Sequence, residues 1–435
     1  MTFTEFLPLG LFMITLVLGM PIGFSLLATG AIGIYLNIGY MPMMGILQSE
    51  PYRHTASFLL TTIPLFILMA EFLARGTVVR DLFRSAFAFF GHLRGGLALA
   101  AVAANVGFAA LSGSSTAAAA AMARISVPEM RRFGYDDRLS LGTVAIAGTL
   151  AIMIPPSLGL IIYGILTEMS IGRLFIAAII PGMLSAAGFV ISILVWVRRE
   201  PEIAPSVARA SWGERRATLL PVAPALLLVV FIAGAIYSGA ATPTEAAAIG
   251  ASSALLISII FGGLRSRGSI DALRSSVRTT AMIFTIIIGA MVFGKFLALT
   301  RMPQDLLETI VAMDLPGFVV IAILIAMYLI LGCFLDQLAI ILLTLPLTFP
   351  LVVGLGYDPI WFGIVLTKTS EIGMVTPPLG LNSFVVSGAT NTPVERTFAG
   401  VWRFLIGDFI VLLLLLLVPS LSLWLPELWY GPMSH

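Results

Sequence analysis

Long apolar runs, separated by short polar segments, fill most of this 435-residue chain. A helix needs about 20 mostly apolar residues to cross a bilayer, and many of the runs reach that length. Their spacing predicts an all-α polytopic membrane protein. We expect about ten spanning helices, near positions 4–20, 22–38, 58–74, 139–166, 174–197, 219–237, 244–262, 280–299, 359–387 and 402–423.

Two further apolar runs, 97–127 and 317–350, contain a polar interruption near their middle. The first is interrupted by Ser-Gly-Ser-Ser-Thr at 112–116 and the second by Asp336-Gln337. An arm of about 15 residues is about 22 Å long as a helix, which passes the bilayer centre without crossing it. Polar backbone at that depth is tolerated only where it is buried in protein or lines a cavity. We therefore predict two re-entrant helical hairpins.

Composition and charge agree with a membrane protein. Only 11% of the residues are charged and the mean hydropathy is +1.05, whereas soluble domains are about 25% charged. Cytoplasmic loops of membrane proteins are rich in arginine and lysine. If both hairpins enter and leave on one side, nineteen of the 24 basic residues become cytoplasmic, and Arg53, Arg173 and Arg301 lie outside. The lone Cys333 excludes an internal disulfide, and the net charge of +2 gives no reason to expect a nucleic-acid partner.

The sequence repeats itself at an offset of 222 residues. The triplet Gly-Tyr-Asp occurs at 134–136 and at 356–358, and a proline pair occurs at 155–156 and at 377–378. The charge distribution places the two triplets on opposite sides of the membrane, so the repeats are inverted. Inverted repeats with helices broken near mid-membrane indicate a secondary transporter. The alternative is a pair of similar units without functional symmetry.

The proline pairs predict breaks in two spanning helices. Proline has no N–H to donate, so the carbonyls four residues earlier lose their helical donors. If each break faces the hairpin tip of its own half, hydroxyl and carbonyl oxygens form two sodium sites, and we expect sodium to be the only metal and no other cofactor. The first site would comprise Ser112, Gly113, Ser114, Ser115, Thr116, Ala151, Ile152, Pro155 and Ser157. The second would comprise Asp336, Gln337, Gly373, Met374, Thr376, Pro377, Gly380 and Asn382. The alternatives are small-residue helix packing, a structural role for Asp336 and simple proline kinks.

Three other polar residues lie in or near predicted spans. Lys368 and Glu371 are three apart and share a helical face; a buried ion pair and contacts with substrate are equally good interpretations. Asp408 lies near a span end, where an interfacial or structural role is expected. Outside the spans, segment 77–94 reads as an interfacial amphipathic arm with 299–316 as its mate, and the basic stretch 265–278 as a separate cytoplasmic segment.

At these motifs the chain resembles the large membrane subunit of tripartite ATP-independent periplasmic (TRAP) transporters, over essentially its whole length. The pieces that carry the resemblance are 112–122, 134–137, 154–164, 242–251, 334–350 and 376–384. The resemblance implies a scaffold and a mobile transport domain that work by an elevator motion in the bacterial inner membrane. It also implies a separate four-helix membrane subunit and a periplasmic binding protein that delivers an organic acid. The expected domains are scaffold helices 1–75, a first repeat unit 76–173, scaffold helices 174–298 with linker 198–218, a second repeat unit 299–400 and a C-terminal scaffold helix 401–435.

The expected function is sodium-coupled uptake of a small carboxylate. An anion between the two sodium sites would gain from nearby positive helix N-termini; the pocket candidates are Ser115, Thr116, Pro156, Ser157, Pro378 and Asn382. The runner-up is a stand-alone dicarboxylate/sodium symporter without a binding protein, and an ion channel is a weaker alternative. We expect no enzymatic activity, because no catalytic motif occurs at a suitable depth.

Overall fold

The computed structural model describes residues 3–313 and 315–431, and these residues are helical apart from their turns and connections. The helices are α1 (Phe3–Val17), α2 (Ile22–Ile38), α3 (Tyr40–Thr55), η1 (Phe58–Thr61), α4 (Thr62–Arg75), α5 (Val78–Phe90), α6 (Gly96–Ser112), α7 (Ser115–Arg132), α8 (Asp137–Met153), α9 (Leu158–Thr167), α10 (Ile171–Arg199), η2 (Pro201–Ile203), α11 (Trp212–Leu219), α12 (Ala223–Tyr237), α13 (Pro243–Ile260), α14 (Ser266–Leu299), α15 (Met302–Ala312), α16 (Gly317–Phe334), α17 (Gln337–Gly354), α18 (Pro359–Gly373), α19 (Leu381–Thr390), α20 (Val394–Leu417) and α21 (Ser420–Tyr430).

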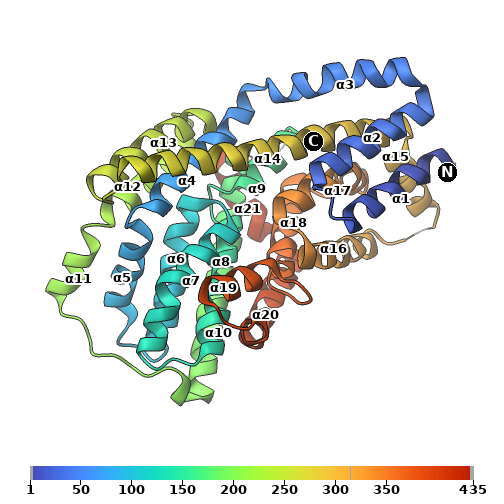
Figure 1. Ribbon diagram of the computed structural model, residues 1–435. Coiled ribbons are helices and arrows are strands. Elements are labelled where there is room, and N and C mark those ends of the chain that lie inside the picture. The colour runs from blue at the N-terminus through green and yellow to red at the C-terminus, as the bar shows by residue number, and fades with distance from the viewer. Residues whose placement is uncertain (1–2, 314, 432–435) are drawn as a thin grey trace.

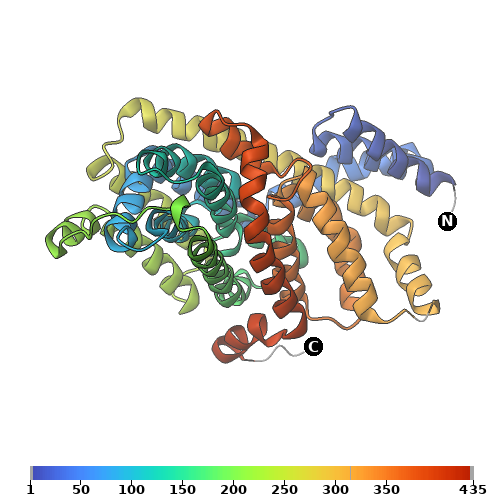
Figure 2. The same cartoon turned by 90° about the horizontal axis from the view of Figure 1, so that it is seen from below.

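The helices form two packed groups. The first consists of α1–α4 and α12–α14, in which the 34-residue α14 packs along α2 and α4, and α13 packs on α4. In Figures 1 and 2, α1 and α2 lie at the opposite end of the molecule from α11. The long helix α14 bridges much of the distance between them (Figure 1).

The second group contains both hairpins and both broken helices. α6 and α7 form the first hairpin and α16 and α17 the second, and the proline pairs separate α8 from α9 and α18 from α19. The long helices α10 and α20 pack against each other, and both pack on α8 and α18. The sequence-based domain limits placed these two long helices with the scaffold. Their contacts lie with the broken helices, and the division into scaffold and transport domains stays a prediction.

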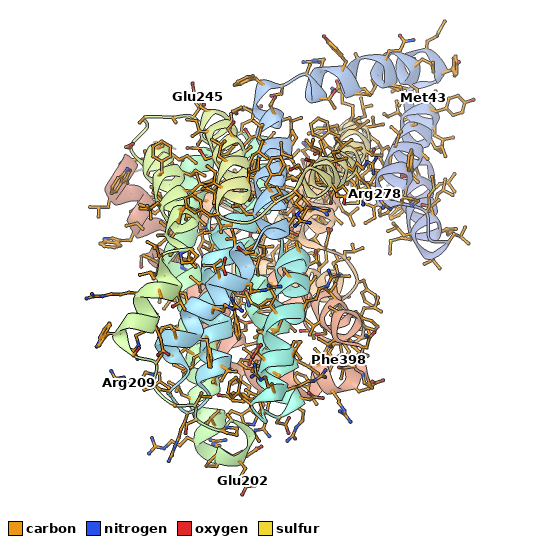
Figure 3. All side chains as sticks on the ribbon, turned by 60° about the vertical axis from the view of Figure 1, so that its left-hand side comes forward. Met43, Glu202, Arg209, Glu245, Arg278 and Phe398 are labelled. Atoms are coloured by element: carbon orange, nitrogen blue, oxygen red, sulfur yellow. The ribbon has the colours of Figure 1, made fainter. Side chains whose placement is uncertain are left out.

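The element order confirms the repeat. Four pairs of helices begin at an offset of 222 or 223 residues: α7 and α17, α8 and α18, α9 and α19, and α10 and α20. The Pro155-Pro156 and Pro377-Pro378 peptide bonds are both cis. The polar linker after α10 and the start of α13 lie at opposite ends of the molecule (Figure 3). Glu202 and Arg209, in the linker after α10, lie far from Glu245 at the start of α13 (Figure 3).

The number of spans differs from the expected ten. Within the described residues, eight helices or continuous helix pairs are long and apolar enough to cross a membrane, or nine if the bent pair α11 and α12 forms one span. Helices α1 and α2 have only 15 and 17 residues, so they fall short of this length. The arms α16 and α17 have 18 residues each, about 27 Å of helix, so each counts alone. The exact number of crossings therefore stays a prediction.

Three segments differ from the sequence-based expectation. α3 is helical although it contains Pro51, and its low hydropathy hid it from a search for spans. The basic stretch 265–278 is not a separate segment, because it forms the first turns of α14. The last predicted span ends at Leu417 rather than at position 423, because Pro419 follows and a new helix, α21, begins there.

Candidate transport site

The tip of the first hairpin is a tight turn pressed against the break of its own half. α6 ends at Ser112, and Gly113 adopts a left-handed conformation with φ of 58°. A Cβ atom at Gly113 would lie 2.9 Å from the Pro156 carbonyl oxygen, so this position requires glycine both for its backbone angle and for the close approach. The expected pairing of the first tip with the first break is therefore present.

The first break supplies its own replacement hydrogen bonds. Ser157 is fully buried, and its Oγ donates to the Ile152 carbonyl at 2.6 Å. This carbonyl receives no helical hydrogen bond, because Pro156 has no N–H. The Leu160 N–H in turn donates to Ser157 Oγ at 3.4 Å, which caps α9. The Ile152 carbonyl therefore has a protein partner, and its part in an ion site stays a prediction. Ala151, whose helical donor would be Pro155, receives none from that residue.

The second break also satisfies the carbonyls that the sequence assigned to a cation site. The Thr376 N–H donates to the Gly373 carbonyl and the Asn382 N–H donates to the Met374 carbonyl, each at 3.0 Å. The Gly380 N–H donates to the Cys333 carbonyl of α16 at 3.0 Å, so the break contacts the hairpin of its own half. The Gly373 and Met374 carbonyls therefore have backbone partners in place of the helical donors that Pro377 and Pro378 cannot supply, and their part in a cation site stays a prediction.

The tip of the second hairpin contains one capping residue and one buried amide. Asp336 accepts a hydrogen bond from the Ala339 N–H at 2.8 Å, so it serves as the N-cap of α17. Gln337 is buried, and its Nε2 donates to Thr367 Oγ1 at 3.1 Å. One carboxylate oxygen of Asp336 therefore has a structural role as a helix cap.

The two halves interlock at the tips through four residues that are repeat mates. Asn382, which the sequence assigned to the second ion site and to the pocket shared with Ser115, donates from Nδ2 to Ser115 Oγ of the first hairpin at 2.6 Å. At the corresponding place in the other half, the Gln337 side chain lies directly over Gly159, and a Cβ on Gly159 would overlap it. Counted from the helix starts, Ser115 corresponds to Gln337 at an offset of 222, and Gly159 corresponds to Asn382 at an offset of 223. A small residue faces a large one in both contacts, with the order reversed.

Three buried oxygen atoms around these tips have no hydrogen-bond partner within the described part of the chain. They are Ser112 Oγ, Gln337 Oε1 and Asn382 Oδ1. The orientation of the Asn382 amide follows from its second donor contact, with the Ala145 carbonyl at 3.2 Å. Buried polar atoms are usually satisfied, so an unsatisfied group needs an explanation such as a ligand. Their role as ligands of a cation or a substrate stays a prediction.

The remaining candidates are peripheral to these contacts. Thr376 Oγ1 donates to the Ile372 carbonyl at 2.6 Å, which is a local helical bond. Pro377 and Pro378 are exposed. Ser114 and Thr116 are half-buried, with their hydroxyls 3.4 Å apart.

A fully buried charged network lies beside the breaks. Lys368 Nζ contacts Asp408 Oδ1, Glu371 Oε2 at 3.2 Å and Ser185 Oγ at 2.8 Å. Thr149 Oγ1 donates to Glu371 Oε1 at 2.7 Å. All three charged side chains have no exposed surface. This decides between the interpretations of Lys368 and Glu371 in favour of an ion pair, and it places Asp408 in the interior instead of at an interface.

Sequence reasoning missed Asp408 as the third member of this network. The signal was present in the repeat, because Asp408 corresponds to Ser185 at an offset of 223, and Glu371 corresponds to Thr149 at 222. Each pair of mates meets at the network. A polar residue at both copies of a position inside predicted spans indicates a shared buried location near the axis that relates the halves.

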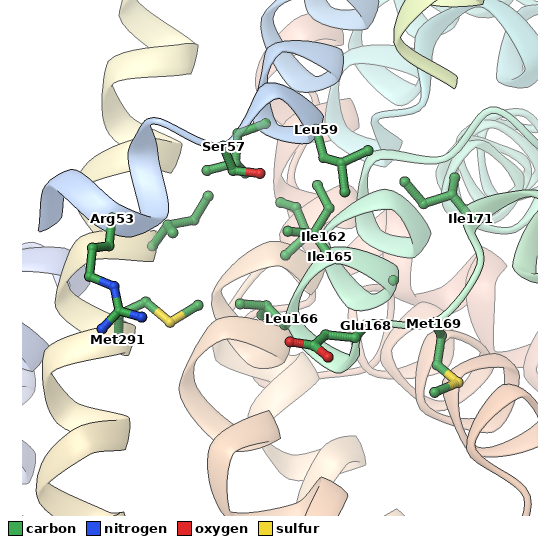
Figure 4. A pocket seen from close by; sticks show the side chains of 13 residues that line it. Arg53, Ser57, Leu59, Ile162, Ile165, Leu166, Glu168, Met169, Ile171 and Met291 are labelled. Atoms are coloured by element: carbon green, nitrogen blue, oxygen red, sulfur yellow. The ribbon is translucent and has the colours of Figure 1, made fainter. Parts of the chain in front are cut away.

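Cavities lie between the two helix groups, away from the tips. One of about 550 Å³ is bounded by Arg53 at the end of α3, by residues of α9, by Glu168 and by Met291 of α14 (Figure 4). Another of about 340 Å³ lies between α14 and α17. The predicted tip residues do not line either of them. The contact surface between the groups is therefore incompletely filled along α14.

Comparison with known proteins settles the family. Residues 9–421 match the family model described as "Tripartite ATP-independent periplasmic transporter, DctM component". The chain belongs to the TRAP transporter large-permease family. Among its relatives, the C4-dicarboxylate TRAP transporter large permease protein DctM of Pseudomonas aeruginosa is 38% identical, covering 87% of this chain and 88% of the relative.

Other members of the TRAP large-permease family carry different substrate names at similar distance. The sialic acid TRAP transporter large permease SiaM of Vibrio cholerae and the ectoine TRAP transporter large permease TeaC of Halomonas elongata are each 32% identical, over 95% of this chain and 96% of the relative. Two solved transporters share the fold at low identity. They are Neisseria gonorrhoeae MtrF (TM-score 0.54, 14% identity, 94% of each chain) and Alcanivorax borkumensis YdaH (TM-score 0.52, 15% identity, 96% of this chain and 99% of that one).

Proposed function

We propose that this TRAP permease imports a small organic acid by sodium symport, together with a separate small membrane subunit and a periplasmic binding protein, in the bacterial inner membrane. The family description names one component of a tripartite, ATP-independent system, which supports the partners and an ion gradient as the energy source. The relative with 38% identity is named for C4-dicarboxylates, which supports a carboxylate substrate.

One observation carries the ion-binding part of the proposal. Ser112 Oγ, Asn382 Oδ1 and Gln337 Oε1 are buried oxygens without hydrogen-bond partners among the residues that the structure describes, and they come from both halves of the repeat. Hard cations such as sodium prefer oxygen ligands. In the proposed mechanism a sodium ion joins the free oxygens at each tip, and this fixes the tip against the facing helix before the substrate binds.

The substrate lies between the two tips in this proposal. The helices α7 and α9 begin at Ser115 and Leu158, and helix N-termini carry a partial positive charge that favours a carboxylate. Ser115 also contacts Asn382 at 2.6 Å, so ion binding and substrate binding share one pair of side chains. This sharing would make substrate affinity depend on sodium.

The transport step is proposed to be an elevator motion of the second helix group against the first. The hollows between α14 and the helices α9 and α17 support a surface that can slide, because its side chains are not tightly interdigitated. In this proposal α10 and α20 move with the broken helices, since the buried Lys368 network joins α8, α10, α18 and α20.

The proposal is tested by uptake into liposomes that contain the permease, its small subunit and its binding protein, with an imposed sodium gradient and a panel of carboxylates. Ser115→Ala and Asp336→Ala are expected to raise the sodium concentration for half-maximal uptake about tenfold, equivalent to about 1.4 kcal/mol of ion binding. Asp336→Asn keeps the helix cap and so separates capping from ion binding, and Ser211→Ala, at an exposed loop cap, serves as the control.

Two results would contradict the proposal. Unchanged sodium dependence in both Ser115→Ala and Asp336→Ala would remove these residues from the ion sites. Full uptake without any binding protein would favour a stand-alone dicarboxylate/sodium symporter instead of the tripartite system.

A further inference from the structure

A groove of about 490 Å³ runs between α5 and α7, away from the tips and the cavities along α14. One wall carries Arg80 and Arg84 of α5, which are four residues apart and share a helical face. The opposite wall carries Arg124 and Arg132 of α7, eight residues apart and likewise on one face. Two basic rows therefore face each other across the groove.

Aromatic and aliphatic side chains complete the groove. Phe83 and Phe87 stack with their ring centroids 6.4 Å apart, and Phe133 lies 5.6 Å from Phe87. Leu97 and Ile125 add apolar surface. The groove thus combines a positively charged rim with an apolar floor.

The charge in this groove is not balanced by the protein. Glu129 is the only acid among the described residues that line it, and it lies 3.6 Å from Arg132. Arg80, Arg84 and Arg124 form no ion pair with a carboxylate anywhere in residues 3–313 or 315–431. Three exposed positive charges are left for a ligand.

We propose that this groove binds the headgroup of an anionic phospholipid of the cytoplasmic leaflet. Arginine forks bind phosphate oxygens in pairs, and basic pockets between helices on the cytoplasmic side bind acidic headgroups. Arg80, Arg84, Arg124 and Arg132 are among the nineteen basic residues that the charge distribution places in the cytoplasm. The apolar floor has no complementary surface on a hydrated soluble anion, whereas the start of an acyl chain covers it.

The bound lipid would connect two helices that are separated along the chain by α6. α5 is the arm that leads into the first hairpin, and α7 is the second arm of that hairpin, which begins at the proposed transport tip. A headgroup held by Arg84 on one side and Arg124 on the other stabilises their spacing. Anionic lipid is therefore expected to raise the thermal stability of the permease.

The test measures binding of phosphatidylglycerol and phosphatidylcholine to the purified full-length permease, both as lipid retained after purification and as a shift of the melting temperature. Phosphatidylglycerol should be retained in preference and should stabilise the protein more. Arg84→Gln is expected to weaken phosphatidylglycerol binding about fivefold, since each basic residue near an anionic surface contributes about 1 kcal/mol. The triple variant Arg80→Gln, Arg84→Gln, Arg124→Gln is expected to abolish the difference between the two lipids.

The matched control removes the same charge from another basic face. Arg267→Gln, Arg274→Gln and Arg278→Gln on α14 should leave the preference for phosphatidylglycerol intact. If the control variant lost the preference for phosphatidylglycerol equally, the effect would be one of general surface charge, and the proposed binding site would be wrong. If soluble glycerol phosphate raised the melting temperature as much as phosphatidylglycerol does, the groove would bind a soluble anion and the proposed lipid ligand would be wrong. If the triple variant does not fold, Arg84→Gln decides, because Arg80 and Arg124 also line a neighbouring cavity that Arg84 does not line.

Discussion

The two breaks are repeat mates in sequence, yet they lie in different surroundings. At the first break Pro156 and Ser157 are buried, whereas at the second break Pro377, Pro378 and Leu379 are exposed. The local solutions also differ, because a serine hydroxyl replaces the lost donor in the first half and backbone N–H groups replace it in the second. The two equivalent segments are therefore exposed to different degrees, although both contain a cis proline pair.

The halves also divide the chemistry between them. At the central network the second half supplies Lys368, Glu371 and Asp408, while the first half supplies the hydroxyls of Thr149 and Ser185. The repeat has kept the positions and changed the residue types. The backbone repeat therefore determines where the polar groups meet, and the residue types, which differ between the halves, determine which half carries the charge.

The largest loss of stability should follow from removing the cation of the buried network. Lys368→Met leaves two carboxylates buried without a cation, and breaking a buried ion pair in this way costs about 3–5 kcal/mol. We expect a large fall in the melting temperature and in the free energy of unfolding of the purified permease. Ser185→Ala removes only the neutral contact from the first half and should cost about 1 kcal/mol.

The ratio between these two variants is the informative quantity. If Lys368→Met and Ser185→Ala lowered stability equally, the charges of the second half would contribute no more than the hydroxyls of the first. The proposed division of chemistry between the halves would then be wrong. Melting of both variants in the same detergent, compared with the unaltered permease, gives the answer.

A second variant tests the reversed order of small and large residues at the tips. In Gly159→Asn the new side chain would occupy the volume of the Gln337 amide, and overpacking of this kind costs about 1–3 kcal/mol. Gln337→Ser should restore much of the lost stability in the double variant, because it reproduces the Asn382–Ser115 arrangement of the other half. Thermal unfolding of both single variants and the double variant measures the coupling.

If Gln337→Ser did not restore stability to Gly159→Asn, the proposed contact between these two positions would be contradicted. Additive losses in Gly159→Asn and Gln337→Ser would mean that the two residues do not compete for one space. A matched variant at the helix surface, Gly388→Asn, meets no atom within 4 Å of its Cβ and should change stability little.

Much of the fold could be predicted from the sequence because its signals are local. Apolar length predicted the helices, and proline pairs predicted the breaks between α8 and α9 and between α18 and α19, since proline cannot donate the helical hydrogen bond. The hairpins followed from polar turns at Ser112–Thr116 and Asp336–Gln337. Helix α3 was missed because its hydropathy is low, and its contacts with α2 and α14 are tertiary.

The site was only partly predictable, because its decisive contacts join residues from different halves. The sequence placed Asn382 in the second ion site and in a pocket shared with Ser115, but it gave no sign of the direct contact between these two side chains, 267 residues apart. Fixed-offset reasoning matches equivalent positions, but it does not say which of them touch. The same limit hid Asp408, whose burial depends on Lys368 and on the packing of α20.

The smallest expected effect compares the two breaks directly. Ser157→Ala removes a buried hydroxyl that donates to the Ile152 carbonyl and accepts from the Leu160 N–H. Loss of such a contact costs about 1 kcal/mol, and more where a buried carbonyl is left unsatisfied. Thr376→Ala removes an equally short hydrogen bond, to the Ile372 carbonyl at 2.6 Å, but it lies beside exposed prolines, where water can replace it. Ser157→Ala should therefore lower the melting temperature more than Thr376→Ala does. Equal losses would mean that the second break is as closed to water as the first, and the asymmetry between the halves would then be confined to their side chains.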